Sequence, residues 1–160
     1  MEEILELKDY FVNQQYEHAF AIVEKLEVMG RQNKINNLES LLVILLIHLI
    51  KIQVENRITR SWKNSLSSSL LAIQKHNRLK HKDHYYIEPH QWNQYISACQ
   101  CEAILGASRE VLEGMDYLDL EKLVDPEQLT IIAGELLALT YDLSPREIIE
   151  FIESRFVVGF

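Results

Sequence analysis

The chain has 160 residues, of which 48 % are apolar and 9 % aromatic, and its net charge is −8. A chain of this length buries about two-thirds of the surface that it exposes when unfolded, so neither a metal nor a disulfide is required for stability. We therefore expect one domain over residues 1–160. The two cysteines, Cys99 and Cys101, diverge on a helix, which makes the pair a poor zinc site.

The charges are distributed unevenly along the chain. Residues 1–50 carry eight acidic and four basic side chains, residues 51–100 carry three and eight, and residues 101–160 carry 13 and four. An acidic protein has no general attraction to nucleic acid, so we do not expect nucleic acid as the partner. Binding through the basic segment 51–100 is an alternative, as is attraction between the basic and acidic segments within the fold.

Two helices are expected at the start of the chain. Ile4, Leu7 and Phe11 suggest a short first helix. Apolar residues recur at helical spacing over residues 19–29 and predict a second. Gly30 then predicts a break or a kink, and the polar residues 31–37 separate this helix from the next.

The third expected helix, over about residues 38–54, is central. Residues 41–50 are apolar except His48, so other helices must surround it. The apolar run lies between Glu39 and Lys51 and is shorter than the roughly 20 residues that a membrane span needs. Because Met1-Glu2-Glu3 is acidic, no targeting signal is visible. We expect a cytoplasmic protein and no membrane partner.

Later helix starts are marked by capping residues. A helix is expected from Thr59 or Ser61, followed by a loop over residues 76–90. Asp125 and Ser144 each precede a proline and, at the third helical position, a glutamine or glutamate, which is typical of a capped helix start. The predicted fold class is all-α, a compact bundle of about six helices around the central helix.

Four segments form an ordered pattern: Val23 to Arg31 (VEKLEVMGR), Leu38 to Leu41 (LESL), Leu45 to Lys51 (LLIHLIK) and Arg60 to Lys63 (RSWK). In order and spacing they resemble the cyanobacterial Domain of Unknown Function 29 family, over about residues 20–77. The helices over about residues 89–160 diverge from that family. The resemblance implies a helical, cytoplasmic, cyanobacterial protein and brings with it no activity, catalytic residue or cofactor.

Four residues of this pattern are the first candidates for a site: Glu39, His48, Lys51 and Trp62. A polar residue inside an apolar helix needs a partner. His48 is either a metal ligand or acid–base group or, as we prefer, a neutral core histidine bonded to a neighbouring helix. Trp62 is more simply explained as a packing anchor than as a binding platform.

The loop before residue 90 holds the best candidate for a metal site. His81, His84, Glu88 and His90 could supply enough nitrogen and oxygen ligands for zinc. Neighbouring lysines oppose a cation, so we favour a solvated loop and keep metal binding as an alternative function.

The function expected from the sequence is a non-catalytic protein-interaction or accessory module that binds a protein partner or itself. The sequence lacks a glycine-rich phosphate loop and the local context of a hydrolase serine, so we lean against an enzyme and expect no cofactor. The apolar C-terminus suggests a surface that seeks a partner. Its candidate interaction residues are Phe156, Val157, Val158 and Phe160.

Overall fold

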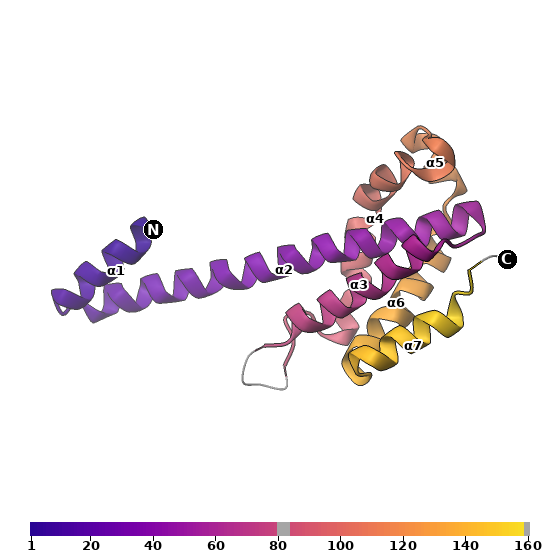
Figure 1. Ribbon diagram of the computed structural model, residues 1–160. Helices are drawn as coiled ribbons and strands as arrows, with labels where there is room; N and C mark the ends of the chain where they lie inside the picture. The colour runs from indigo at the N-terminus through magenta and orange to yellow at the C-terminus, as the bar shows by residue number, and fades with distance from the viewer. Residues whose placement is uncertain (80–83, 159–160) are drawn as a thin grey trace. The chain divides into compact units, whose positions relative to one another are not determined.

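The computed structural model describes residues 1–79 and 84–158. Over these residues it contains seven α-helices, two 3₁₀ helices and no strand, apart from an isolated antiparallel bridge between Arg78 and Tyr85. The α-helices are α1 (Glu2–Val12), α2 (Tyr16–Glu55), α3 (Arg60–Asn77), α4 (Trp92–Ser108), α5 (Tyr117–Leu123), α6 (Pro126–Asp142) and α7 (Pro145–Arg155); the 3₁₀ helices are η1 (Pro89–Gln91) and η2 (Val111–Glu113) (Figure 1). The predicted all-α fold is confirmed.

The chain divides into two compact units, unit 1 (Met1–Asn36) and unit 2 (Asn37–Phe160), and the boundary falls inside α2. We describe each unit by itself. The expectation of a single domain stays a prediction.

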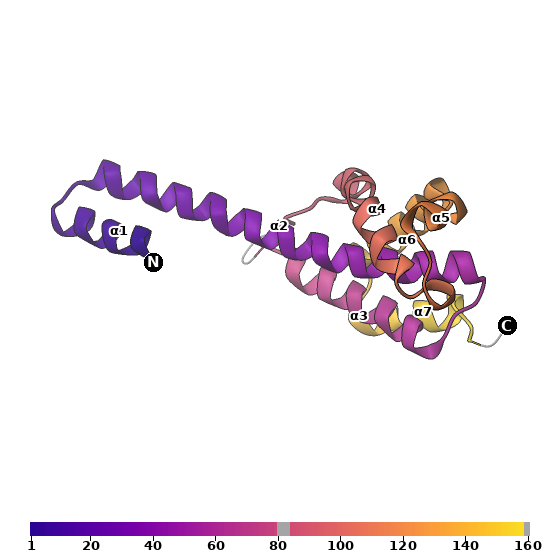
Figure 2. The ribbon, with the colours of Figure 1, turned by 90° about the horizontal axis from the view of Figure 1, so that it is seen from above.

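Unit 1 is a helical hairpin, in which α1 folds back along the first part of α2 (Figures 1 and 2). The turn passes through Gln14, whose φ of 59° is left-handed. The rings of Tyr10 and His18 stack with their centroids 5.1 Å apart, and Lys25 Nζ lies 4.0 Å from Glu3 Oε1. In this unit only Ala19 is buried, and α1 buries no residue. Two helices alone therefore leave most of their apolar surface in water.

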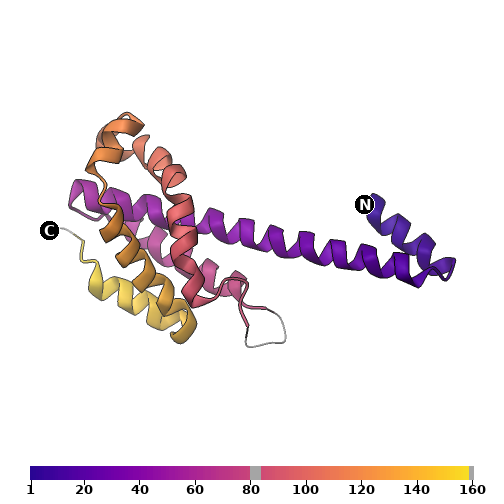
Figure 3. The same cartoon turned by 180° about the vertical axis from the view of Figure 1, so that it is seen from behind.

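Unit 2 has a core built around the second part of α2. The fully buried leucine and isoleucine side chains of that part are Leu38, Leu42, Leu45, Leu46 and Ile50. Helix α3 lies against α6 and α7, while α4 lies against α5 and α6 (Figures 2 and 3). Each buried leucine contributes about 2 to 3 kcal/mol through removal of apolar surface from water. The predicted central helix is thus buried as expected.

The predicted break at Gly30 is wrong. Gly30 is exposed inside α2, and a Cβ added there would meet nothing within 4 Å. A glycine costs a helix only about 1 kcal/mol, and the polar residues after it are compatible with a helix. Gln32, for example, donates a hydrogen bond to Asn36 one turn later (2.8 Å). The two helices predicted over 19–29 and 38–54 are therefore one.

The capped helix starts are confirmed. Asp125 accepts a hydrogen bond from the Gln128 N–H (3.1 Å) at the start of α6. Ser144 accepts one from the Glu147 N–H (3.2 Å), and the Glu147 carboxylate accepts one from the Ser144 N–H (3.1 Å). The bond from the Ser144 N–H to the carboxylate, with a smaller contribution from the Ser144 side chain, holds the pKa of Glu147 below its ordinary value. The short α5 was not predicted, because its seven residues bury only Leu120.

Among the described helices, α2 alone is long and apolar enough to cross a membrane by length and composition. A core helix has the same properties, and 44 % of the most apolar stretch of α2 is buried in the fold. This observation is weak support for a membrane span, and the prediction of no membrane partner stays a prediction.

Candidate functional site

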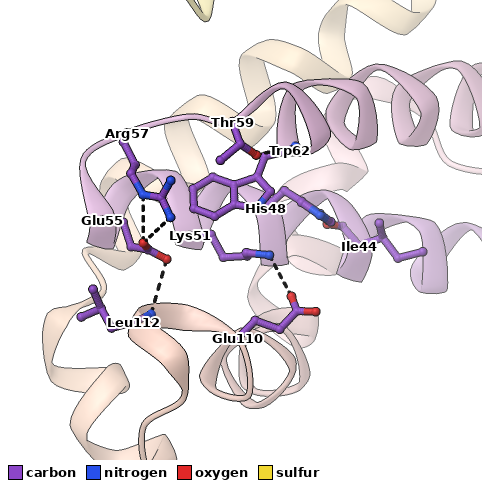
Figure 4. Close-up of polar contacts among 9 residues, drawn as sticks. All are labelled: Ile44, His48, Lys51, Glu55, Arg57, Thr59, Trp62, Glu110 and Leu112. Atoms are coloured by element: carbon purple, nitrogen blue, oxygen red, sulfur yellow. Dashed lines mark hydrogen bonds and ion pairs between the residues drawn. The ribbon is translucent and has the colours of Figure 1, made fainter. Parts of the chain in front are cut away.

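The structure brings together two of the four candidate residues, Lys51 and Trp62. Lys51 is near the end of α2 and Trp62 is in the first turn of α3; they are 6 % and 8 % exposed. Thr59 caps α3 by accepting a hydrogen bond from the Trp62 N–H (3.1 Å). The chain turns back between the two helices, so that Lys51 Nζ lies 4.8 Å from the centroid of the Trp62 ring (Figure 4). This is a cation–π contact.

Glu110 supplies the counter-charge of the buried lysine. Lys51 Nζ donates a hydrogen bond to Glu110 Oε2 at 2.8 Å (Figure 4). This bond, together with the charges of Lys51 and His48, holds the pKa of Glu110 below its ordinary value despite some burial. The pair joins α2 to a segment 59 residues further along the chain.

A second ion pair lies beside the same tryptophan. The Arg57 guanidinium carbon is 4.8 Å from the centroid of the Trp62 ring, and its Nη2 lies 3.0 Å from Glu55 Oε1. The other carboxylate oxygen of Glu55 accepts a hydrogen bond from the Leu112 N–H (3.4 Å). Leu112 has a left-handed φ of 50°. The segment from Glu110 to Leu112 is thus bonded to α2 at two points: Glu110 bonds to Lys51, and the Leu112 N–H bonds to Glu55.

These side chains border a pocket of about 710 Å³, which we call the Lys51 pocket. Its lining residues are Lys51, Glu55, Arg57, Trp62, Glu110, Leu112 and Glu113. Both cations are paired with carboxylates, and the lining holds no serine, threonine or cysteine. The pocket can orient a polar group or anchor the Glu110–Glu113 segment.

The other two candidates of the pattern, His48 and Glu39, are not among the residues that line this pocket. His48 Nδ1 donates to the Ile44 carbonyl oxygen of the preceding turn (2.8 Å), so its partner is on its own helix and not on a neighbouring one. Glu39 is half-buried further up α2. Burial, with the charges of Glu39 and Glu102, raises the pKa of the Cys99 thiol to about 11. The effect of Glu39 in this structure is thus to add to the rise that burial causes in the pKa of Cys99.

The proposed metal ligands are described only in part. His81 lies outside the described residues. His84 and His90 are exposed. Glu88 caps η1: its side chain accepts a hydrogen bond from the Gln91 N–H, and its own N–H donates one to the Gln91 side chain. Within residues 1–79 and 84–158, no three His, Cys, Asp or Glu side chains lie close enough to hold a metal ion. A metal site that includes His81 stays a prediction.

Asn77, the last residue of α3, bonds to Ile87 and to Tyr141 of α6. The Asn77 amide donates to the Ile87 carbonyl oxygen (2.9 Å) and to the Tyr141 hydroxyl (3.1 Å), and its oxygen accepts from the Ile87 N–H (2.8 Å). The Tyr141 hydroxyl also accepts from Trp92 Nε1. Burial raises the pKa of Tyr141 to about 12. Tyr85 packs edge-on against the Tyr141 ring, with centroids 4.6 Å apart.

The apolar C-terminus is partly committed to the fold. Phe156 is half-buried against the core of unit 2, whereas Val157 and Val158 are exposed. Phe160 lies outside the described residues. The tail therefore offers two small exposed side chains within the part that can be described.

Several large apolar side chains of unit 1 are exposed, and the sequence did not predict this. We call Ile4, Phe11, Tyr16 and Phe20 the hairpin face. Ile4 and Phe11 are two turns apart on α1, and Tyr16 and Phe20 are one turn apart on α2, so each pair shares a side of its helix. The rings of Phe11 and Tyr16, 6.4 Å apart, connect the two pairs. Further exposed apolar residues of the unit are Leu5, Val12, Val28 and Met29.

Comparison of the chain with family models, with curated proteins and with solved structures finds no match. The function must therefore be argued from the residues themselves.

Proposed function

We propose that this chain is a non-catalytic protein-interaction module, and that the hairpin face is its contact surface. The observation that carries the proposal is that α1 buries no residue although it has large apolar side chains. Soluble proteins rarely leave contiguous apolar patches in water, and such patches mark interaction sites. A partner that covers the hairpin face would bury the apolar side chains that unit 1 alone leaves in water.

We also propose that the chain is a member of the Domain of Unknown Function 29 family, and that it is a cytoplasmic protein of a cyanobacterium. The ordered pattern of segments over about residues 20–77 supports the family. The contact between Lys51 and Trp62 is consistent with it, because it gives both motif residues a packing reason to occur together.

The ion pairs of unit 2 disfavour the nucleic-acid alternative. Nucleic-acid affinity depends on cations that are free to neutralise phosphates. In the basic segment 51–100, three cations are instead paired with carboxylates of the protein: Lys51 with Glu110, Arg57 with Glu55 and Lys63 with Glu153. Two of these pairs, Lys51 with Glu110 and Lys63 with Glu153, join the basic segment to the acidic segment 101–160. They are an instance of the attraction within the fold that the sequence offered as an alternative.

A site-specific cross-linking experiment tests the proposal. A photoreactive phenylalanine analogue replaces Phe20, and in the control chain it replaces Leu118 on α5; these residues are 64 % and 66 % exposed. On irradiation of the expressing cells, we expect adducts of defined mass from position 20 and none from position 118. Absence of adducts at position 20, or the same pattern at both positions, would contradict the proposal.

A further inference from the structure

We infer that the partner of the hairpin face is the hairpin face of a second copy of this chain, and that the two hairpins form a four-helix bundle. This inference rests on the proposed function and specifies its partner.

The exposed area of unit 1 suits a dimer. The four residues of the hairpin face, with the neighbouring Leu5 and Val12, are between 41 % and 80 % exposed. Side chains of this size expose about 100 Å² each at these fractions, or roughly 600 Å² in all. A stable interface buries about 800 Å² per partner. One hairpin face therefore nearly suffices for one half of a standard interface, without a contribution from unit 2.

The architecture of the hairpin also favours a second copy. A unit of 36 residues has too little core to be stable without a partner. Two antiparallel helical hairpins that pack face to face form a four-helix bundle, in which each apolar stripe meets another. A two-fold contact of this kind needs only that one surface complements itself. Three aromatic rings, those of Phe11, Tyr16 and Phe20, suit this because offset rings can interleave across a two-fold axis.

The charges of unit 1 favour another hairpin over a membrane surface. Residues 1–36 carry seven acidic and four basic side chains, so anionic lipid would repel them. The two signs are separated: α1 has four acidic residues and only Lys8, whereas residues 30–36 have Arg31 and Lys34 and no acid. Two copies can place the acidic block of one beside the basic block of the other, which a membrane cannot do.

Light scattering and native mass spectrometry of the full chain test the inference. The monomer mass is 18.8 kDa, and we expect a species of twice that mass at micromolar concentration. The substitution Phe20→Glu places a charge in the centre of the contact and should raise the dissociation constant by about 30-fold or more, as expected at an interface hot spot. The matched control Leu118→Glu makes the same change at an equally exposed residue of unit 2 and should leave the dimer intact.

A second variant guards against misfolding of the first. Tyr16→Ala introduces a stronger helix former and should weaken the dimer with unchanged far-ultraviolet circular dichroism. A monomer at every concentration up to about 100 μM, well above the range of such interfaces, would overturn the inference, as would a dimer that both substitutions leave intact. Sedimentation of the chain with phosphatidylserine vesicles in a Phe20-dependent manner would overturn it in favour of a membrane.

The cross-linking experiment separates the two proposals. Adducts from position 20 at twice the monomer mass support both. Adducts of another mass from a monomeric chain reject the second copy and leave the interaction module standing, whereas no adduct rejects both.

Discussion

Removal of one partner from the Lys51–Glu110 pair should be asymmetric in its effect on stability. In the substitution Glu110→Gln, the ammonium of Lys51 stays buried and loses its counter-charge. In Lys51→Met, the apolar stem is replaced by a side chain of similar shape, and the carboxylate left behind is 58 % exposed and solvated by water. We therefore expect Glu110→Gln to be the more destabilising change.

The geometry of the pair gives rough magnitudes. Loss of one partner of a fully buried pair costs about 3 to 5 kcal/mol, and an exposed pair is worth about 0 to 1 kcal/mol. Because only one partner is buried here, we expect Glu110→Gln to lower the free energy of unfolding by about 1 to 2 kcal/mol. Lys51→Met removes a cation–π contact of about 0.5 to 1 kcal/mol, but it also removes the cost of burying the ammonium. Because the two effects oppose each other, the net change in stability should be below about 1 kcal/mol.

Urea unfolding followed by tryptophan fluorescence measures these differences, since Trp62 and Trp92 both report on unit 2. The control is Glu150→Gln, which breaks the exposed pair of Glu150 with Arg146 and should change stability by less than about 0.5 kcal/mol. If Lys51→Met proved the more destabilising change, or if Glu110→Gln matched the control, the reasoning would be refuted.

The pH dependence of the same pair has a defined sign. The pKa of Glu110 is lower in the folded state than in the unfolded state, because of the bond from Lys51. Its contribution to stability is therefore complete above the unfolded pKa and is lost as the pH falls through the lower pKa of the folded state. The difference in unfolding free energy between wild type and Glu110→Gln should shrink between pH 7 and pH 3, because a protonated Glu110 is neutral like glutamine. A difference that stays constant over this range would contradict the assignment.

Three other predictions follow from features outside the Lys51 pocket. Gly30→Ala should increase stability by about 1 kcal/mol at an exposed helical position with free space, and hydrogen exchange of the surrounding amides should slow; faster exchange would count against a continuous α2. Asn77→Ala leaves the buried Ile87 N–H unpaired, while the Ile87 carbonyl keeps its bond from the Tyr141 hydroxyl; it should destabilise unit 2 by about 1 to 3 kcal/mol in urea unfolding, more than Tyr141→Phe, and the reverse order would disprove the bonding scheme. Iodoacetamide at pH 8 should modify the exposed Cys101 well before Cys99, whose thiol is buried and has a raised pKa, and mass mapping of the peptides would reveal equal labelling if the burial were wrong.

The features that the sequence predicted correctly depend on neighbours along the chain. Asp125 and Ser144 cap helices by accepting hydrogen bonds from residues three positions later, so four consecutive residues contain the whole capping motif. Lys51 and Trp62 were singled out because they belong to the ordered pattern of segments over about residues 20–77. The break at Gly30 was wrong because a local penalty of about 1 kcal/mol was given more weight than the length of helix on either side.

The features that the sequence did not predict depend on contacts between distant segments. Glu110 lies 59 residues from Lys51, and nothing in its own neighbourhood marks it as the partner of a buried lysine. The hairpin face was missed for another reason. Apolar periodicity in Ile4 and Phe11 shows that a helix has an apolar side, but it does not show which other element, if any, covers that side.

The position of α3 in unit 2 has a consequence for synthesis of the chain. Its apolar side chains lie against α6 and α7, and Lys63 is paired with Glu153, 90 residues later. When α3 leaves the ribosome, the helices that will cover it have not yet been made. Leu66, Leu70 and Ile73, fully buried in the finished fold, are then open to solvent and to other chains. The order of helices along the gene therefore sets a period during translation when unit 2 is prone to aggregate, and this period ends only when α7 docks.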